Sequence, residues 1–263
     1  LCELNQFHDA LEYYEKALEI DSDSHYLLGL YLALKLKICD WKYLNELRLT
    51  LKNKLINKQR VVLPLDAHLL FDDPKLHFLS SKILAQEYNH FNNSESLSNL
   101  RGEKIRIGFF SSDLRYHPVT IWLTEQIENH DNNKFELYAF SFLSNSDPMR
   151  NRLRLAFDYW FDVEDLSDIE LIILAREQKL DIAIDLNGFS KGGRTACFAA
   201  RVAPIQVNHL GFPGTMGAEY IDYIISDKYS IPDENLQFIT EKVVYIPCIY
   251  TYDSHRQIGR AHV

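Results

Sequence analysis

A histidine followed by a proline stands after the first long apolar segment of the chain's second half. His117 follows the segment KIRIGFFSSD at residues 104–113, and Pro118 disfavours helical backbone at the residue before it, which keeps the imidazole in a loop. An imidazole in a loop can orient or deprotonate a hydroxyl near neutral pH. A histidine at this position can also cap the helix that follows, and the sequence leaves both roles open.

A second polar stretch, DLNGFSKGGR at residues 185–194, follows the apolar segment LDIAI. Its glycines allow backbone N–H groups to turn toward a ligand, and Lys191 and Arg194 could meet a phosphate. A P-loop requires G-x-x-x-x-G-K-[ST]. Here Lys191 precedes the glycine pair, and no Ser or Thr follows it directly. The spacing does not match a P-loop, and it favours a structural turn over an anion site.

The elements that must position these residues alternate between apolar segments and helical patterns from residue 103 onward. The predicted strands lie within residues 104–113, 134–143, 159–163, 180–186, 205–212, 221–227 and 242–247. The predicted helices span residues 119–130, 147–157, 167–179 and 192–202. This alternation predicts a mostly parallel sheet with helices on both faces. Ligands bind at the carboxyl ends of such strands, so we expect residues 111–117, 185–194 and 210–215 to meet at one edge.

The first 22 residues carry the pattern of a helical repeat. Ala10, Tyr14 and Ala17, followed by Asp21 at the turn, match the second helix of a tetratricopeptide repeat. In such repeats small residues let the helices pack closely, and one repeat cannot bury its own apolar face. We therefore expect this helix to belong to a longer array.

Further helices are predicted between this repeat and residue 103. Two follow directly, the first capped by Ser22 or Asp23 and the second by Asp40. The D-x-D spacing at residues 21–23 resembles a metal motif of one glycosyltransferase class, but it lies in a helix connection and we interpret it as capping. Another helix is expected to begin near Pro74, and residues 92–99, NNSESLSN, form a predicted polar linker.

Composition excludes several classes of protein. The formal net charge of -9 argues against a general affinity for nucleic acid or for an anionic membrane. No segment is apolar over the length of a membrane span, and the N-terminus has no signal-peptide pattern. The cysteines lie far apart without zinc-ligand spacing, which fits the reduced thiols of a cytoplasmic protein and predicts no metal site. These cysteines are Cys2, Cys39, Cys197 and Cys248.

Taken together, these segments resemble the O-linked N-acetylglucosamine transferase family, including its SPINDLY-like bacterial members. The matching text is KIRIGFFSSDLRYHPV, DLNGFSKGGRTACFAARVAPIQVNHLGFPGTMGAEYIDYIISDK and EKVVYIP, preceded by tetratricopeptide helices and by CDW at residues 39–41. The resemblance covers almost the whole chain. It implies the amino-terminal, Rossmann-like α/β lobe of a two-lobed GT-B fold at residues 103–257, after the repeats (1–53) and a helical connection (54–102).

The resemblance also implies a reaction. Family members carry out inverting, metal-independent transfer of N-acetylglucosamine from UDP-N-acetylglucosamine to Ser or Thr hydroxyls of proteins, and no cofactor is expected. Acceptor proteins or peptides would bind through the repeats, and neither nucleic acid nor membrane is an expected partner. UDP-glucose and GDP-fucose stay open as sugar donors. A tetratricopeptide scaffold that binds peptides without catalysis stays open as the alternative function.

The resemblance and the chemistry of the three loops together give the candidate site residues. His117 matches the histidine of the family's His-Pro motif and is the first catalytic candidate. Asp185, a carboxylate at a strand end that could orient the acceptor, is the second. The expected substrate-binding residues are Pro118, Asn187, Gly188, Lys191, Arg194, Gly211, Pro213, Gly214 and Thr215. For Lys191, a solvated surface position is an open alternative.

Two positions depart from the family pattern. Phe189 stands where relatives often carry Tyr or His, and His209 stands where Tyr or Trp is common. Stacking and hydrogen bonding both change with these residue types, so the preference for a sugar donor or an acceptor does not carry over. We interpret His209 as a packing residue.

The last six residues, IGRAHV at 258–263, match the translation of a sequencing adapter. We interpret them as non-native, with a native tail as the alternative, and the chain as a fragment whose nucleotide-binding lobe lies downstream. On this interpretation we expect the chain alone to be catalytically inactive and not to bind UDP.

Overall fold

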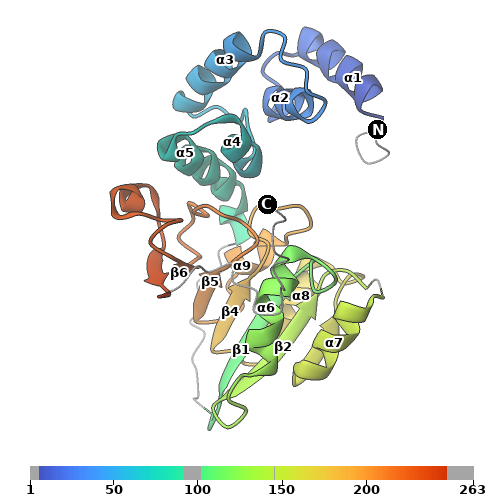
Figure 1. The fold of residues 1–263 in the computed structure, drawn as a ribbon, viewed down its shortest axis with the longest axis vertical. Helices are drawn as coiled ribbons and strands as arrows, with labels where there is room; N and C mark the ends of the chain where they lie inside the picture. The colour runs from blue at the N-terminus through green and yellow to red at the C-terminus, as the bar shows by residue number, and fades with distance from the viewer. Residues whose placement is uncertain (1–5, 92–101, 145, 248–263) are drawn as a thin grey trace, which may run out of the picture. The chain divides into compact units, whose positions relative to one another are not determined.

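The computed structural model describes residues 6–91, 102–144 and 146–247, and the chain forms two compact units (Figure 1). The helical unit consists of the residues up to Asn89 together with Gly214–Ala218 and Gln237–Thr240. The sheet unit consists of His90–Pro213, Glu219–Leu236 and the residues from Glu241 onward. Residues 92–99 and 258–263, Cys2 and Cys248, on which predictions were made, lie outside the described residues.

The sheet unit is built on seven parallel strands in the order β3-β2-β1-β4-β5-β6-β7. Every segment predicted as a strand contains one, so the predicted parallel α/β sheet is confirmed. The strands are β1 (Ile105–Ser111), β2 (Phe135–Ser141), β3 (Tyr159–Asp162), β4 (Ile182–Asp185), β5 (Ile205–Asn208), β6 (Tyr223–Ser226) and β7 (Lys242–Tyr245). A 3-10 helix, η3 (Asp233–Phe238), precedes β7 in the chain.

Helices cover both faces of the sheet, as predicted, because successive strand residues point to opposite sides. Phe109 of β1 packs in the core cluster formed with α6 (Pro118–Glu128) and α7 (Pro148–Ala156). Its neighbour Phe110 stacks on Phe140 of β2 and meets Phe198 of α9 (Thr195–Ala199) edge-on. The helix α8 (Asp168–Glu177) contacts α9. Figure 1 shows α6 and α8 alongside the central strands.

The helical unit packs short helices around one apolar cluster. Leu32, Leu51, Leu55 and Ala67 are fully buried in it. A Cβ at Gly29 would lie 2.7 Å from the carbonyl oxygen of Val61. A glycine is therefore required where α2 (Leu27–Lys37) packs against the backbone at Val61. The helices are α1 (Phe7–Ile20), α2 (Leu27–Lys37), α3 (Leu44–Ile56), α4 (Pro64–Leu70), α5 (Pro74–Ala85) and the 3-10 helix η2 (Gln86–Phe91).

The predicted helix beginning at Pro74 is confirmed as α5. The Asp73 side chain accepts the Lys75 N–H at its N-terminus, and the proline occupies the first turn, where it costs no hydrogen bond. The helix α4, which also begins at a proline, was not predicted separately.

The predicted caps of α2 and α3 are wrong. The residues that precede these helices are Tyr26 and Tyr43, both with left-handed backbone and without a side-chain cap. The acids form other contacts instead: Asp23 pairs with Lys54 of α3, and Asp40 pairs with Lys35 of α2. An acidic side chain near a helix start can form an ion pair with a lysine of a neighbouring helix instead of accepting a backbone N–H. The local sequence spacing does not show which of the two partners it will bind.

Candidate functional site

The sheet has its switch point between β1 and β4. The chain leaves β1 through residues 112–117 and reaches β2 on one side, while β4 lies on the other side of β1. Loops at such a point diverge and leave a crevice at the carboxyl ends of the strands. The Ser112 N–H donates to Asn187 Oδ1 over 2.8 Å, and the His209 N–H donates to the Asp185 carbonyl over 3.0 Å. The loops after β1, β4 and β5 therefore meet at one edge, as predicted.

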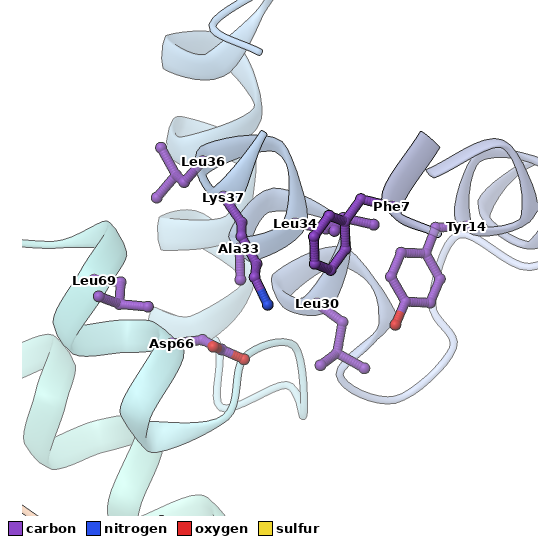
Figure 2. A pocket seen from close by; sticks show the side chains of 9 residues that line it. All are labelled: Phe7, Tyr14, Leu30, Ala33, Leu34, Leu36, Lys37, Asp66 and Leu69. Atoms are coloured by element: carbon purple, nitrogen blue, oxygen red, sulfur yellow. The ribbon is translucent and has the colours of Figure 1, made fainter. Parts of the chain in front are cut away.

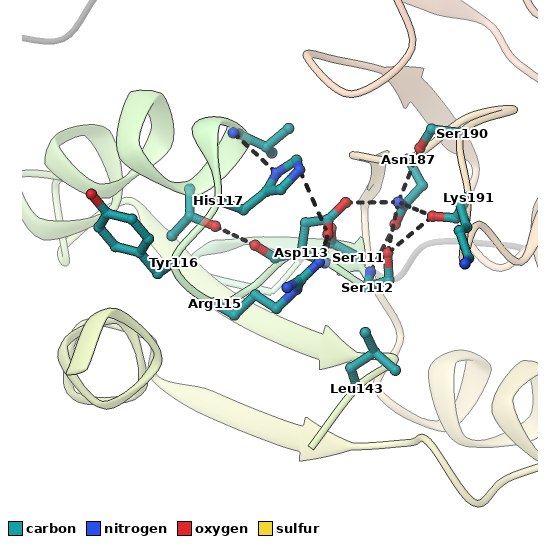
Figure 3. A network of polar contacts seen from close by, with 12 residues as sticks. Ser111, Ser112, Asp113, Arg115, Tyr116, His117, Leu143, Asn187, Ser190 and Lys191 are labelled. Carbon is teal, nitrogen blue, oxygen red and sulfur yellow. Dashed lines mark hydrogen bonds and ion pairs between the residues drawn. The ribbon is translucent and has the colours of Figure 1, made fainter. Parts of the chain in front are cut away.

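Asn187 joins the loops after β1 and β4. Its side chain is fully buried, and its Nδ2 group lies 2.9 Å from Ser112 Oγ and 3.2 Å from Asp113 Oδ2 (Figure 3). Nδ2 also lies 3.4 Å from the Lys191 carbonyl. A buried amide that uses both its donor and its acceptor capacity in this way fixes the distance between the two loops.

Asp113 lies at the centre of this network, although the sequence analysis did not select it. Its side chain is 11% exposed, and Oδ1 accepts from Arg115 Nη2 over 3.1 Å. The same oxygen lies 3.9 Å from His117 Nε2. The Thr120 hydroxyl donates to the Asp113 carbonyl. The available signal was the position of Asp113 just after a buried strand, at the sheet's switch point.

His117 caps α6 and remains accessible. Its Nδ1 accepts the Val119 N–H over 3.4 Å, and its side chain is 35% exposed. The structure thus confirms the capping role, with Pro118 in the first turn of the helix. Because Nδ1 is an acceptor in this contact, the neutral ring carries its proton on Nε2, the nitrogen that faces Asp113. The ring is therefore set up as a hydrogen-bond donor.

Asp185 is turned into the protein. The side chain is buried, and Oδ1 accepts the N–H groups of Asn187 and Gly188 over 2.9 and 2.8 Å. Burial raises the pKa of this carboxyl from its usual 3.8 to about 6, and the two N–H donors oppose part of the rise. Gly188 has a φ of 53°, in the left-handed region that glycine adopts easily. These contacts close a tight turn after β4.

The two cations of the same loop are in different environments. Arg194 donates from Nε to Asp168 Oδ1 over 2.7 Å and from its two terminal nitrogens to the carbonyls of Val163 and Leu166. The Arg194 side chain is 16% exposed. Lys191 is exposed. The guanidinium therefore clamps the segment that leads into α8, whereas Lys191 lies on the exposed side of the loop.

The loop after β5 contributes to both units. A Cβ at Gly211 would lie 1.8 Å from the Leu186 carbonyl oxygen, so only glycine fits against the β4 loop. Pro213 is exposed and belongs to the sheet unit. Gly214 and Thr215 belong to the helical unit, where Thr215 Oγ1 lies 2.8 Å from Thr240 Oγ1. His209 is 5% exposed, and burial lowers the pKa of its ring to about 4.

Comparison with known proteins places this geometry in a family. A sequence model of glycosyl transferase family 41 matches residues 75–262, which is well over half of the chain. The chain belongs to glycosyl transferase family 41. The resemblance inferred from the three loops is thereby confirmed, and the switch-point loops are part of a family 41 lobe.

Two relatives carry names that state an activity. The chain is 33% identical over 156 residues to a probable UDP-N-acetylglucosamine–peptide N-acetylglucosaminyltransferase, SEC, of Arabidopsis thaliana, covering 59% of this chain and 16% of the relative. It is 34% identical over 164 residues to the UDP-N-acetylglucosamine–peptide N-acetylglucosaminyltransferase of Caenorhabditis elegans, covering 60% of this chain and 14% of the relative. The chain thus spans less than a fifth of either relative.

A solved structure matches the fold. A mutant of the Thermobaculum terrenum O-GlcNAc transferase superposes with a TM-score of 0.75 at 26% identity, covering 94% of this chain and 49% of that one. The order of N-terminal helices followed by a parallel α/β sheet is the fold class expected for a family 41 lobe, and this prediction is confirmed.

None of the helices in residues 6–91, 102–144 and 146–247 combines the length and apolar character of a membrane span. Within the same part of the chain, no group of three or more His, Cys, Asp or Glu side chains is arranged to hold a metal ion.

The site residues predicted from the sequence are thus only partly brought together: Arg194 holds the segment that leads into α8, and Gly214 and Thr215 belong to the helical unit. His117, Asn187 and Lys191 lie around Asp113 at the switch point (Figure 3). Asp185, Gly188 and Gly211 shape the turns beneath it. Their roles toward a substrate stay predictions.

Proposed function

We propose that this chain contributes a catalytic lobe to an inverting transferase that moves N-acetylglucosamine from UDP-N-acetylglucosamine to Ser or Thr hydroxyls of proteins. One observation carries the proposal: the accessible His117 imidazole stands beside the buried Asp113 carboxylate, at the switch point of a family 41 lobe. The names of the plant and nematode relatives support both substrates, because each name states a peptide and UDP-N-acetylglucosamine.

In the proposed reaction, the acceptor hydroxyl oxygen attacks the anomeric carbon of the sugar. The bond from that carbon to the diphosphate oxygen breaks with inversion, UDP leaves, and the hydroxyl loses its proton. The barrier falls when the hydroxyl is held in line with the breaking bond and when the departing charge meets preorganised hydrogen-bond donors.

The two residues divide this work by their hydrogen-bonding capacity. Nδ1 of His117 is used by the helix, so its Nε2–H is the group that can contact a substrate oxygen. We assign His117 the task of orienting the acceptor hydroxyl. Asp113 is the carboxylate beside that ring, and we assign it the task of accepting the hydroxyl proton.

We further propose that the transfer needs no metal ion, because fixed hydrogen-bond donors can stabilise a leaving diphosphate. The test is sugar transfer by the complete gene product that contains this chain, with a Ser/Thr peptide and labelled UDP-N-acetylglucosamine. Equal rates with EDTA and with added Mn²⁺ are expected. Transfer that appears only with Mn²⁺ or Mg²⁺ would contradict the metal-free reaction. Parallel assays with UDP-glucose and GDP-fucose identify the sugar donor.

The alternative is a helical module that binds peptides without catalysis. For either function we propose that acceptor proteins dock on the helical unit. Peptide binding by the complete protein, with no transfer from any of the three nucleotide sugars, would favour the scaffold. Isothermal titration of the 263-residue chain with UDP adds a second test. Micromolar binding would show that the loops after β1 and β4 hold the nucleotide by themselves.

A further inference from the structure

The helical unit contains a pocket of about 520 Å³ between α1, α2 and α4 (Figure 2). Most of its walls are aliphatic and aromatic side chains, which favours a ligand with an apolar body. Two charged side chains, Lys37 of α2 and Asp66 of α4, also line it. The apolar part of the lining includes Phe7, Leu30, Ala33 and Leu69.

Asp66 brings a carboxylate into these apolar surroundings. It lies in the first turn of α4 and is partly buried. In the described part of the chain it forms no hydrogen bond or ion pair. Burial raises the pKa of this carboxyl to about 6, and burial is the single cause of the shift. A partly desolvated carboxylate without a partner is stabilised by any cation that can reach it.

Lys37 does not supply that cation. Its Nζ stands over the Phe7 ring at 4.4 Å from the centroid, a cation–π contact with the pocket's own wall. Within the described structure it forms no ion pair with Asp66. Figure 2 shows the Lys37 side chain extending from α2 and the Asp66 side chain on α4. The ammonium has further N–H groups, which can donate to a carbonyl oxygen.

We propose that this pocket binds an extended peptide segment by taking up one arginine or lysine side chain. Such a side chain has an apolar stem and a cationic head, which matches the pocket. The stem packs on Leu30 and Leu69, and the head pairs with Asp66. Lys37 donates to a carbonyl of the peptide backbone. The source of the segment, an acceptor protein, rests on the proposed function, whereas binding itself does not.

The test is calorimetric titration of the chain with three amidated peptides of five residues. Each has leucine at both ends and alanine beside a central residue, which is arginine, glutamine or glutamate. We expect the arginine peptide to bind at least tenfold more tightly than the glutamine peptide, and the glutamate peptide to bind most weakly. Asp66→Asn should abolish this preference. Asp72→Asn, which removes an exposed carboxylate from the α4–α5 connection, should leave it intact.

A second variant separates binding from stability. Ala33→Phe fills the pocket without changing its charges, and it should weaken all three peptides together. Urea unfolding of each variant shows whether its helical unit is folded. Unchanged arginine-peptide affinity in Asp66→Asn would overturn the proposal, as would tightest binding of the glutamate peptide. A first-turn acid with only a structural role would lower stability in Asp66→Asn and leave the peptide preference unchanged.

The outcome is independent of catalysis. Peptide preference without sugar transfer would leave this inference standing and remove the proposed reaction. Transfer without peptide preference would do the reverse.

Discussion

The loops after β1 and β4 lie side by side at the switch point, but their polar side chains differ in exposure. The β1 loop keeps His117 and Arg115 about one-third exposed, beside the Asp113 carboxylate, which accepts from Arg115 and Asn187. The β4 loop turns Asp185 and Asn187 inward, where both are almost fully buried. The first loop presents hydrogen-bonding groups, whereas the second uses Asp185 to close its own turn and Asn187 to hold the first loop.

This difference shows what a polar residue at a strand end can mean. Adjacent parallel strands end at the same edge, so both loops satisfy the sequence rule for a ligand site. Whether a side chain faces a ligand or a backbone N–H depends on the turn that follows. Asp185 is followed by a turn whose N–H groups point back at it, whereas His117 begins a helix that holds only one of its two nitrogens.

The strongest test of the β4 loop as a rigid support is Gly211→Ala. The new Cβ would stand 1.8 Å from the Leu186 carbonyl oxygen, a backbone atom that cannot move without disturbing β4. We expect a loss of at least about 3 kcal/mol in the free energy of unfolding, measured in urea. Gly102→Ala, whose nearest neighbour would be 3.7 Å away, is the control and should change stability by less than about 0.5 kcal/mol. If both substitutions changed stability by the same small amount, the loop around Gly211 would be able to move to accommodate the added methyl group.

Substitution of His117 tests whether the β1 loop acts on a substrate. His117→Asn keeps a good helix cap and removes the imidazole. Because His117 is assigned to orient the acceptor hydroxyl, we expect turnover of the complete enzyme to fall roughly 10²-fold with little change in melting temperature. His117→Ala should show the same turnover loss and also lose about 1 kcal/mol of stability, because the cap is gone. Full activity in His117→Asn would show that His117 only caps α6 and does not act on the substrate.

The pH dependence of stability tests whether Asp185 is buried in the turn of the β4 loop. Its pKa of about 6 in the folded protein lies above its value of about 3.9 in an unfolded chain, so the folded state binds more protons between these values. Stability contributed by the protonated carboxyl is therefore present below about pH 4 and is lost as the pH rises through 6.

Asp185→Asn removes this dependence. Its amide oxygen can still accept the N–H groups of Asn187 and Gly188. Relative to the wild type, the variant should gain on the order of 2 kcal/mol between pH 4 and pH 7, measured by urea unfolding across that range. Sugar transfer by the complete enzyme should persist. A large fall in turnover with an unchanged stability profile would instead support direct contact between Asp185 and the substrate.

The fold was predictable because apolar periodicity and strand–helix alternation are local signals, and every predicted strand was found. The failures have a common cause. Asp40 and Asp23 were predicted as caps but pair with lysines, and Asp113 was overlooked although it holds the centre of the candidate site. Each case depends on which cation or amide folding brings close to a carboxylate. Sequence spacing does not specify that neighbour.

The smallest expected effect separates the two cations of the β4 loop. Arg194 holds Asp168 and two carbonyls with three nitrogens, and a lysine has a single ammonium that cannot span them. Arg194→Lys should therefore lower the free energy of unfolding in urea by about 1 kcal/mol and leave the affinity of the complete enzyme for UDP-N-acetylglucosamine unchanged.

Lys191→Gln, on the exposed side of the same loop, should change the free energy of unfolding by less than about 0.5 kcal/mol. Weaker sugar-nucleotide binding in Lys191→Gln alone would assign the loop's solvent-facing edge to the substrate and its buried edge to the fold. Weaker binding in Arg194→Lys at unchanged stability would mean that the clamp opens to take a ligand, and the contrast between the two loops would then fail.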